Sequence, residues 1–78
     1  MIDYIDDFVV ANTGTIRLPL VQTFAVVKSV LLTVQTDGNG GVFGIVNDKS
    51  ATLGPDIEVR NISDARVTGL IDAVVVGY

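Results

Sequence analysis

The sequence predicts an all-β domain, a small antiparallel β-sandwich of about six strands. Three observations predict it: β-branched residues dominate, apolar and polar side chains alternate, and turn-forming residues cut the chain into short segments. Valine, isoleucine and threonine favour extended backbone because branching at Cβ restricts the χ1 angle. Runs of alanine, glutamate, lysine and leucine are missing from the sequence, so we expect no helix longer than a turn.

Turn residues mark the boundaries of the expected strands. Clusters of Gly, Pro, Asn, Asp and Ser separate the extended segments. The expected strands are residues 5–11, 15–20, 26–36, 42–47, 57–61 and 66–77. The cluster at residues 37–41 is the clearest turn signal, and it predicts a hairpin between the third and fourth strands. With no repeat or linker, residues 1–78 form one expected domain with a short N-terminal arm over residues 1–4.

The expected strands follow two patterns. In residues 57–61, Ile57 and Val59 share one face and Glu58 and Arg60 the other, so the second face should lie in water. Residues 26–34 and 70–76 are instead apolar on both faces for most of their length. Such a strand fits a core on one side and a partner on the other. The candidate residues for contacts between subunits are Val30, Leu32, Leu70, Val74 and Val76, and the expected core aromatics are Phe8, Phe24 and Phe43.

Size and composition favour association with sister chains. A domain of 78 residues has a small interior, yet 49% of its residues are hydrophobic. The longest apolar stretch, residues 18–34, is interrupted by polar side chains, which argues against membrane insertion. The five basic residues are scattered singly and the net charge is −4, which argues against nucleic acid as a partner. The acidic first residues are unlike a secretory signal.

The residue types needed for catalysis are scarce. The sequence contains no His and no Cys, and its serines lack a residue pattern that would activate them as nucleophiles. We therefore expect no enzyme activity, no cofactor and no metal site. Polar residues of two turns form the only candidate ligand loops, and these residues are Asp37, Asn39, Asn61 and Asp64. Asn61, Ile62 and Ser63 match a glycosylation acceptor, but side chains bonded to the backbone of a turn explain them better.

Two segments carry a resemblance to a known family. Residues 14–35, GTIRLPLVQTFAVVKSVLLTVQ, combine a Gly, an alternating strand, a Phe before a turn and a Lys-Ser-Val entry into a long strand. Residues 54–78, GPDIEVRNISDARVTGLIDAVVVGY, form a polar turn and a last strand that ends in Gly-Tyr. Together they resemble the H-type lectin-like β-sandwich of bacteriophage tail fibres and related virion structural proteins.

The resemblance implies a homotrimer with the third or last strand nearest the threefold axis. It implies a virion protein, assembled in the host cytoplasm, that serves as a component of a tail fibre or adsorption apparatus and contacts other virion proteins. One alternative is a lectin-like module that binds carbohydrate on the host surface, with a cell-surface glycan as partner. A further alternative is a capsid decoration protein.

Overall fold

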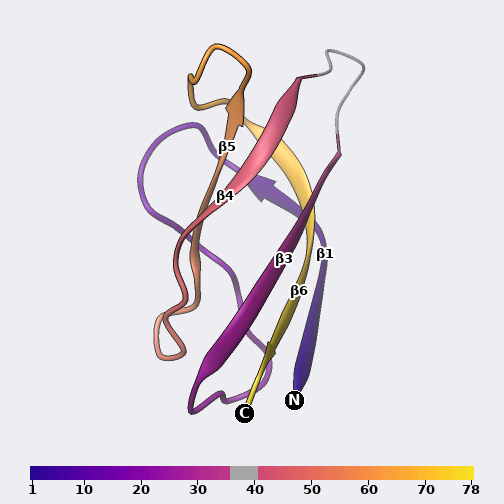
Figure 1. Ribbon diagram of the computed structural model, residues 1–78, viewed down its shortest axis with the longest axis vertical. Coiled ribbons are helices and arrows are strands. Elements are labelled where there is room, and N and C mark those ends of the chain that lie inside the picture. The colour runs from indigo at the N-terminus through magenta and orange to yellow at the C-terminus, as the bar shows by residue number, and fades with distance from the viewer. Residues whose placement is uncertain (36–40) are drawn as a thin grey trace.

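The computed structural model describes residues 1–35 and 41–78, which form six strands in two antiparallel sheets (Figure 1). The first sheet has the order β1-β6-β3, and its strands are β1 (Ile2–Val10), β6 (Gly69–Gly77) and β3 (Val27–Gln35). The second has the order β2-β5-β4, and its strands are β2 (Ile16–Arg17), β5 (Asp56–Asn61) and β4 (Val42–Asp48). The predicted all-β class is therefore confirmed. Among the described residues no helix is long and apolar enough to cross a membrane.

Strand boundaries differ from the prediction mainly near the N-terminus. Residues 2–4, expected in a leading arm, belong to β1, because Ile2, Asp3 and Tyr4 pair with residues 74–76 of β6. β2 has only two residues, since Pro19 has no amide hydrogen to donate to a ladder. The chain beyond β2 still bonds to the sandwich, with the Leu18 amide donating to the Pro55 carbonyl at 2.9 Å.

The predicted hairpin between the third and fourth strands is wrong. β3 and β4 belong to different sheets, and their hydrogen-bonded neighbours are β6 and β5 respectively. Leu32 and Val34 of β3 instead pack over Gly44 of β4, where an added Cβ would lie 2.9 Å from the Leu32 side chain. The link between β3 and β4 therefore crosses from one sheet to the other. The turn residues 36–40 themselves lie outside the described residues.

The core lies between the two sheets. β6 contributes Ile71, Ala73 and Val75, and β5 contributes Ile57 and Val59, all at most 2% exposed. Burial of an aliphatic side chain of this size contributes about 1.5–3 kcal/mol to folding. The two central strands therefore supply half of the ten buried core residues, and the other five come from β1, β3 and the connection between β2 and β3.

Of the three aromatic residues expected in the core, two lie there and one is exposed. Phe24 is buried and Phe8 is partly buried against the core, as predicted. Phe43 is 43% exposed, so its predicted core position is wrong. The reason is the register of β4 on β5, which pairs Phe43 with Arg60 and turns its ring to the outer face.

A buried carboxylate holds the long connection between β2 and β3. Asp3 is only 5% exposed, and its Oδ2 accepts hydrogen bonds from the amides of Val21 (2.8 Å) and Gln22 (3.0 Å). The same connection pairs with the last residue, because the Tyr78 carbonyl accepts from the Val26 amide at 2.7 Å. Gly77 is required there, since a Cβ would lie 2.0 Å from the Val26 carbonyl oxygen. These contacts close one end of the sandwich.

Candidate functional site

The outer face of the β1-β6-β3 sheet carries a continuous group of apolar side chains. The strand register places Ile2 beside Val76 in one row and aligns Tyr4, Val74 and Leu31 in the next. We call these five residues the apolar face. Adjacent strands are about 4.8 Å apart and alternate residues about 6.7 Å apart, so the five side chains touch across all three strands.

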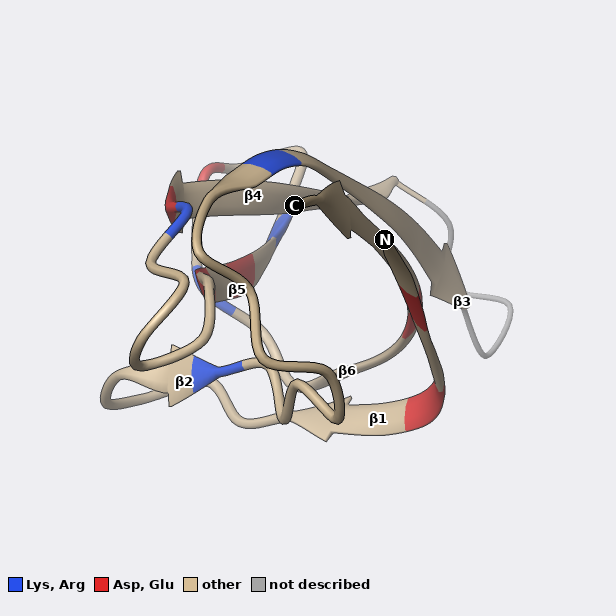
Figure 2. Cartoon of the chain, turned by 90° about the horizontal axis from the view of Figure 1, so that it is seen from below, with Lys and Arg blue, Asp and Glu red and all other residues tan. Residues whose placement is uncertain are grey.

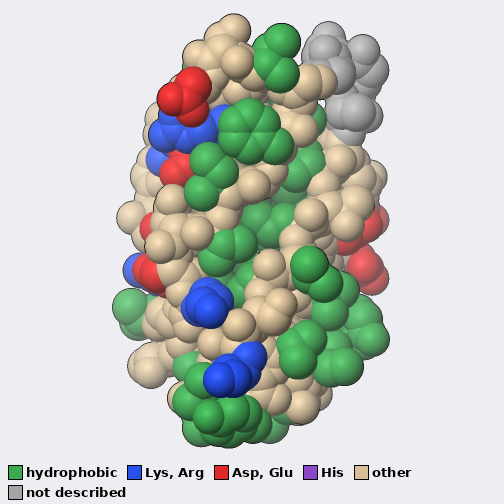
Figure 3. All heavy atoms as spheres, viewed as in Figure 1, with side chains coloured by type: hydrophobic (Ala, Val, Ile, Leu, Met, Phe, Trp, Pro, Cys, Tyr) green, Lys and Arg blue, Asp and Glu red, His purple; other side chains and the backbone are tan. Residues whose placement is uncertain are grey.

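The apolar face is exposed to solvent. Tyr4 is 70%, Leu31 63% and Ile2 44% exposed, and Val74 and Val76 are partly exposed. Hydrophobic side chains gather beside β1 at the lower right of the space-filling view, with acidic side chains above them at the same edge (Figure 3). Contiguous exposed apolar area of this kind is a common feature of surfaces that bind another molecule, so the apolar face is the candidate binding surface.

The register separates the five predicted interface residues into two groups. Leu70, Val74 and Val76 lie on the outer face of β6, where they can contact a partner. Val30 and Leu32 point the other way and pack against the core. Leu31, which the sequence prediction did not include, is the β3 residue on the apolar face.

Two carboxylates lie beside the apolar face at a bulge in β1. The register of β1 on β6 shifts between Ile5 and Phe8, and Asp7 in the bulge has a positive φ of 53°. The Asp7 amide donates to Asp72 Oδ1 at 2.9 Å. Gln35 Nε2 donates to Asp7 Oδ1 at 3.0 Å and to Asp72 Oδ1 at 3.2 Å. We call Asp7 and Asp72 the acidic pair.

The acidic pair has no positively charged neighbour within the described part of the chain. The ion pairs of residues 1–35 and 41–78 all involve Arg17, Arg60 or Arg66, none of which reaches the pair. In the same residues, no group of three or more His, Cys, Asp or Glu side chains is placed to hold a metal ion. The negative charge of the pair is thus not neutralised by an ion pair within the described residues.

The outer face of the second sheet is organised around Glu58. Asn47 Nδ2 donates to Glu58 Oε1 at 2.9 Å, Arg60 Nε donates to Oε2 at 2.6 Å, and Arg66 Nε lies 3.7 Å from Oε2. The hydrogen bond from Asn47, followed by that from Arg60, lowers the pKa of Glu58, and Glu58 in turn raises the pKa of Arg60. Glu58 is only 8% exposed, so the prediction that this face is simply wet is wrong.

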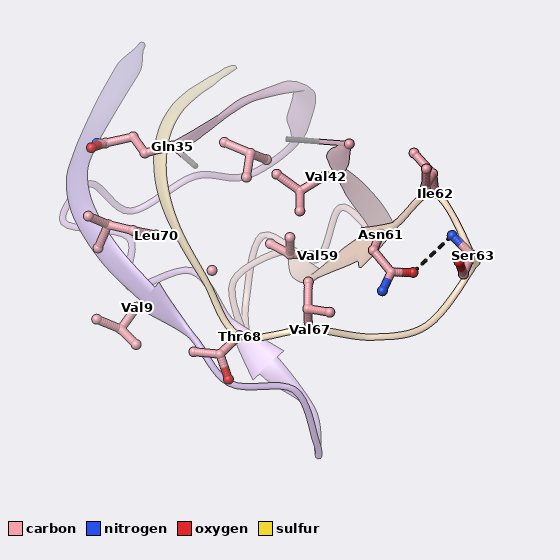
Figure 4. A pocket seen from close by; sticks show the side chains of 13 residues that line it. Val9, Gln35, Val42, Val59, Asn61, Ile62, Ser63, Val67, Thr68 and Leu70 are labelled. Carbon is pink, nitrogen blue, oxygen red and sulfur yellow. Dashed lines mark hydrogen bonds between the residues drawn. The ribbon is translucent and has the colours of Figure 1, made fainter. Parts of the chain in front are cut away.

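An open cavity of about 860 Å³ lies where the two sheets separate (Figure 4). Its described lining is mostly aliphatic, and it includes Val9, Val34, Val42, Val59, Val67 and Leu70. No aromatic ring is present among the described lining residues, so the platform on which sugar rings commonly stack is absent from that part of the cavity.

The candidate ligand loops are only partly described. Asp37 and Asn39 lie outside the described residues. Asn61 lines the cavity, but its Oδ1 accepts hydrogen bonds from the amides of Ser63 (3.0 Å) and Ala65 (3.1 Å). The predicted role of Asn61 in a backbone turn is therefore confirmed. Asp64 lies outside the cavity lining, and its carbonyl accepts from Arg60 Nη1 at 2.7 Å.

Comparisons with known proteins identify no relative of this chain. No protein-family model, no curated protein and no solved structure matches the chain. The apolar face and the acidic pair are thus the features from which a function is inferred.

Proposed function

We propose that the protein is a noncatalytic structural subunit that associates with sister chains through the apolar face. The observation that carries this proposal is the exposure of Tyr4 and Leu31 on either side of Val74. Covering apolar area contributes about 25 cal/mol per Å², and this free energy is gained only when another molecule excludes water from the face. The sister chain supplies an identical apolar face for this purpose.

The assembly we propose is a bacteriophage virion, with the subunit in a tail fibre or adsorption apparatus. The resemblance of residues 14–35 and 54–78 to the H-type lectin-like sandwich supports this placement, and capsid decoration is the alternative within the same class. Mass spectrometry of purified particles tests the placement, because a structural subunit is present in every particle. Its absence from purified particles contradicts the virion role.

Carbohydrate binding receives less support from the site. A lectin needs several free polar groups and a stacking surface, whereas Asn61 and Asp64 are engaged within the chain. Binding of the assembled protein on a glycan array would nevertheless revive this alternative, because several weak sites reinforce one another in an oligomer.

Self-association is tested by the mass of the protein in solution. We expect the wild-type mass, measured by light scattering after size exclusion, to rise with concentration above that of one chain. Val74→Asp should remain a folded monomer, because assembly would bury an unpaired carboxylate. Val76→Asp should act in the same direction.

Phe43→Asp is the matched control, since it places the same charge on an exposed apolar position of the other sheet. This variant should assemble as the wild type does. A wild-type protein that stays monomeric up to about 100 µM, where even a weak specific contact is populated, contradicts the proposal.

A further inference from the structure

Opposite charges lie at the two ends of the apolar face. Asp72 lies two residues before Val74 on the outer face of β6, and Asp7 of β1 lies beside it. Lys28 lies at the other end, one residue before Ser29, which pairs with Val76. Its Nζ is 5.9 Å from the centre of the Tyr78 ring. Within the described residues, Lys28 takes part in none of the ion pairs.

The separation of these charges follows from the strand geometry. Val76 and Asp72 are four residues apart on one strand, which corresponds to about 13 Å. Lys28 lies slightly beyond Val76, so the acidic pair and the lysine flank the apolar residues between them. The face is therefore negative at one end and positive at the other.

This polarity distinguishes two closed arrangements of identical chains. In a threefold bundle with β6 along the axis, each row of residues meets the same row of its neighbours, and three copies of the acidic pair converge. Like charges brought together in this way repel one another. A twofold axis that lies in the plane of the interface, at right angles to the strands, instead brings two faces together with their strands antiparallel, so that the acidic pair of each chain faces Lys28 of the other.

We propose that the apolar face binds a second copy of the chain around a twofold axis, with Lys28 of each copy against the acidic pair of the other. This inference rests on the proposed self-association and specifies its partner and symmetry. The whole outer face of the sheet, three strands of nine residues, measures roughly 30 by 14 Å, which is below the size of a standard stable interface, so the dimer dissociates at micromolar concentrations.

Charge variants test the arrangement by sedimentation equilibrium. Asp72→Asn keeps the oxygen that accepts from the Asp7 amide and removes the charge, while Lys28→Gln changes an exposed side chain only. Each should weaken the dimer about two- to thirtyfold, because two symmetry-related exposed ion pairs are lost. Combining Lys28→Asp with Asp72→Lys should restore affinity relative to either reversal alone. Asp64→Lys, a matched charge change on the loop after β5, should leave dimerisation as in the wild type.

The possible outcomes distinguish a failure of the twofold contact from a failure of self-association itself. A mass of two chains with both neutral variants weakened supports the twofold contact. A mass of three chains, or tighter association of Asp72→Asn, overturns the twofold contact and leaves self-association in place. Dimerisation that is insensitive to Lys28→Gln also overturns it. A wild-type monomer overturns self-association itself.

Discussion

The outer faces of the two sheets differ in how their acidic side chains are neutralised. In the β2-β5-β4 sheet, Glu58 lies between Arg60 and Arg66, so its charge is neutralised inside the chain. In the described part of the β1-β6-β3 sheet, the acidic pair is bonded by the uncharged Gln35 side chain and forms no ion pair, and the apolar face lies beside it. Figure 2 shows acidic residues along the β1 side of the molecule, and both acidic and basic residues around β4 and β5. The charges of the second sheet are paired within one chain, whereas the first sheet leaves apolar side chains and the acidic pair exposed.

The inner faces, by contrast, are equivalent, and this gives the largest expected effect. Ile57 of β5 and Ile71 of β6 are both fully buried at the centre of their sheets. Ile57→Ala and Ile71→Ala should each lower the free energy of unfolding by about 2–5 kcal/mol, because each leaves a cavity. Urea titration below the dissociation constant of the dimer measures the loss without a contribution from assembly.

Leu31→Ala is the control for these two variants, since its side chain lies on the apolar face. At the same low concentration it should change unfolding by no more than about 0.5 kcal/mol. A cost at Ile57 far below that at Ile71 would show that the second sheet is not an equal part of the core.

A smaller effect is expected from the charge network of the second sheet. The pKa of Glu58 is lowered in the folded protein, so its contribution to stability is present above the ordinary carboxyl pKa of about 4.3 and is lost as pH falls through the folded value. Glu58→Gln should therefore show a shallower loss of stability between about pH 5 and pH 3. Thermal melting of both proteins across this range measures the difference. Parallel stability curves would mean that the network does not favour the charged form.

Much of the fold could be predicted because it depends on local pattern. The β-branched composition and the turn residues specify six strands, and the alternation of Ile57 and Val59 identifies the inner face of β5. The pairing of strands could not be predicted in the same way. The strong turn signal at residues 37–41 is local, but β3 pairs with β6, which is distant in sequence.

The candidate site could be predicted only in part, because it too depends on how the strands pair. A strand that is apolar on both sides does not indicate which side faces the core, so Val30 and Leu32 were indistinguishable from Leu31 until the register with β6 was known. The burial of Glu58 also depends on register, because the side chains beside it, Asn47 and Arg66, come from separate segments of the chain. Val74 and Val76 were identified because the last strand has few polar residues on either face.

Thiol labelling tests most directly whether the two outer faces differ. The sequence has no cysteine, so Leu31→Cys and Phe43→Cys would each carry a single thiol, one on each sheet. We predict that labelling of Leu31→Cys slows as protein concentration rises, since sister chains cover the apolar face, while Phe43→Cys reacts at a constant rate. Rates that are independent of concentration at both positions would contradict the claim that the β1-β6-β3 face binds a sister chain.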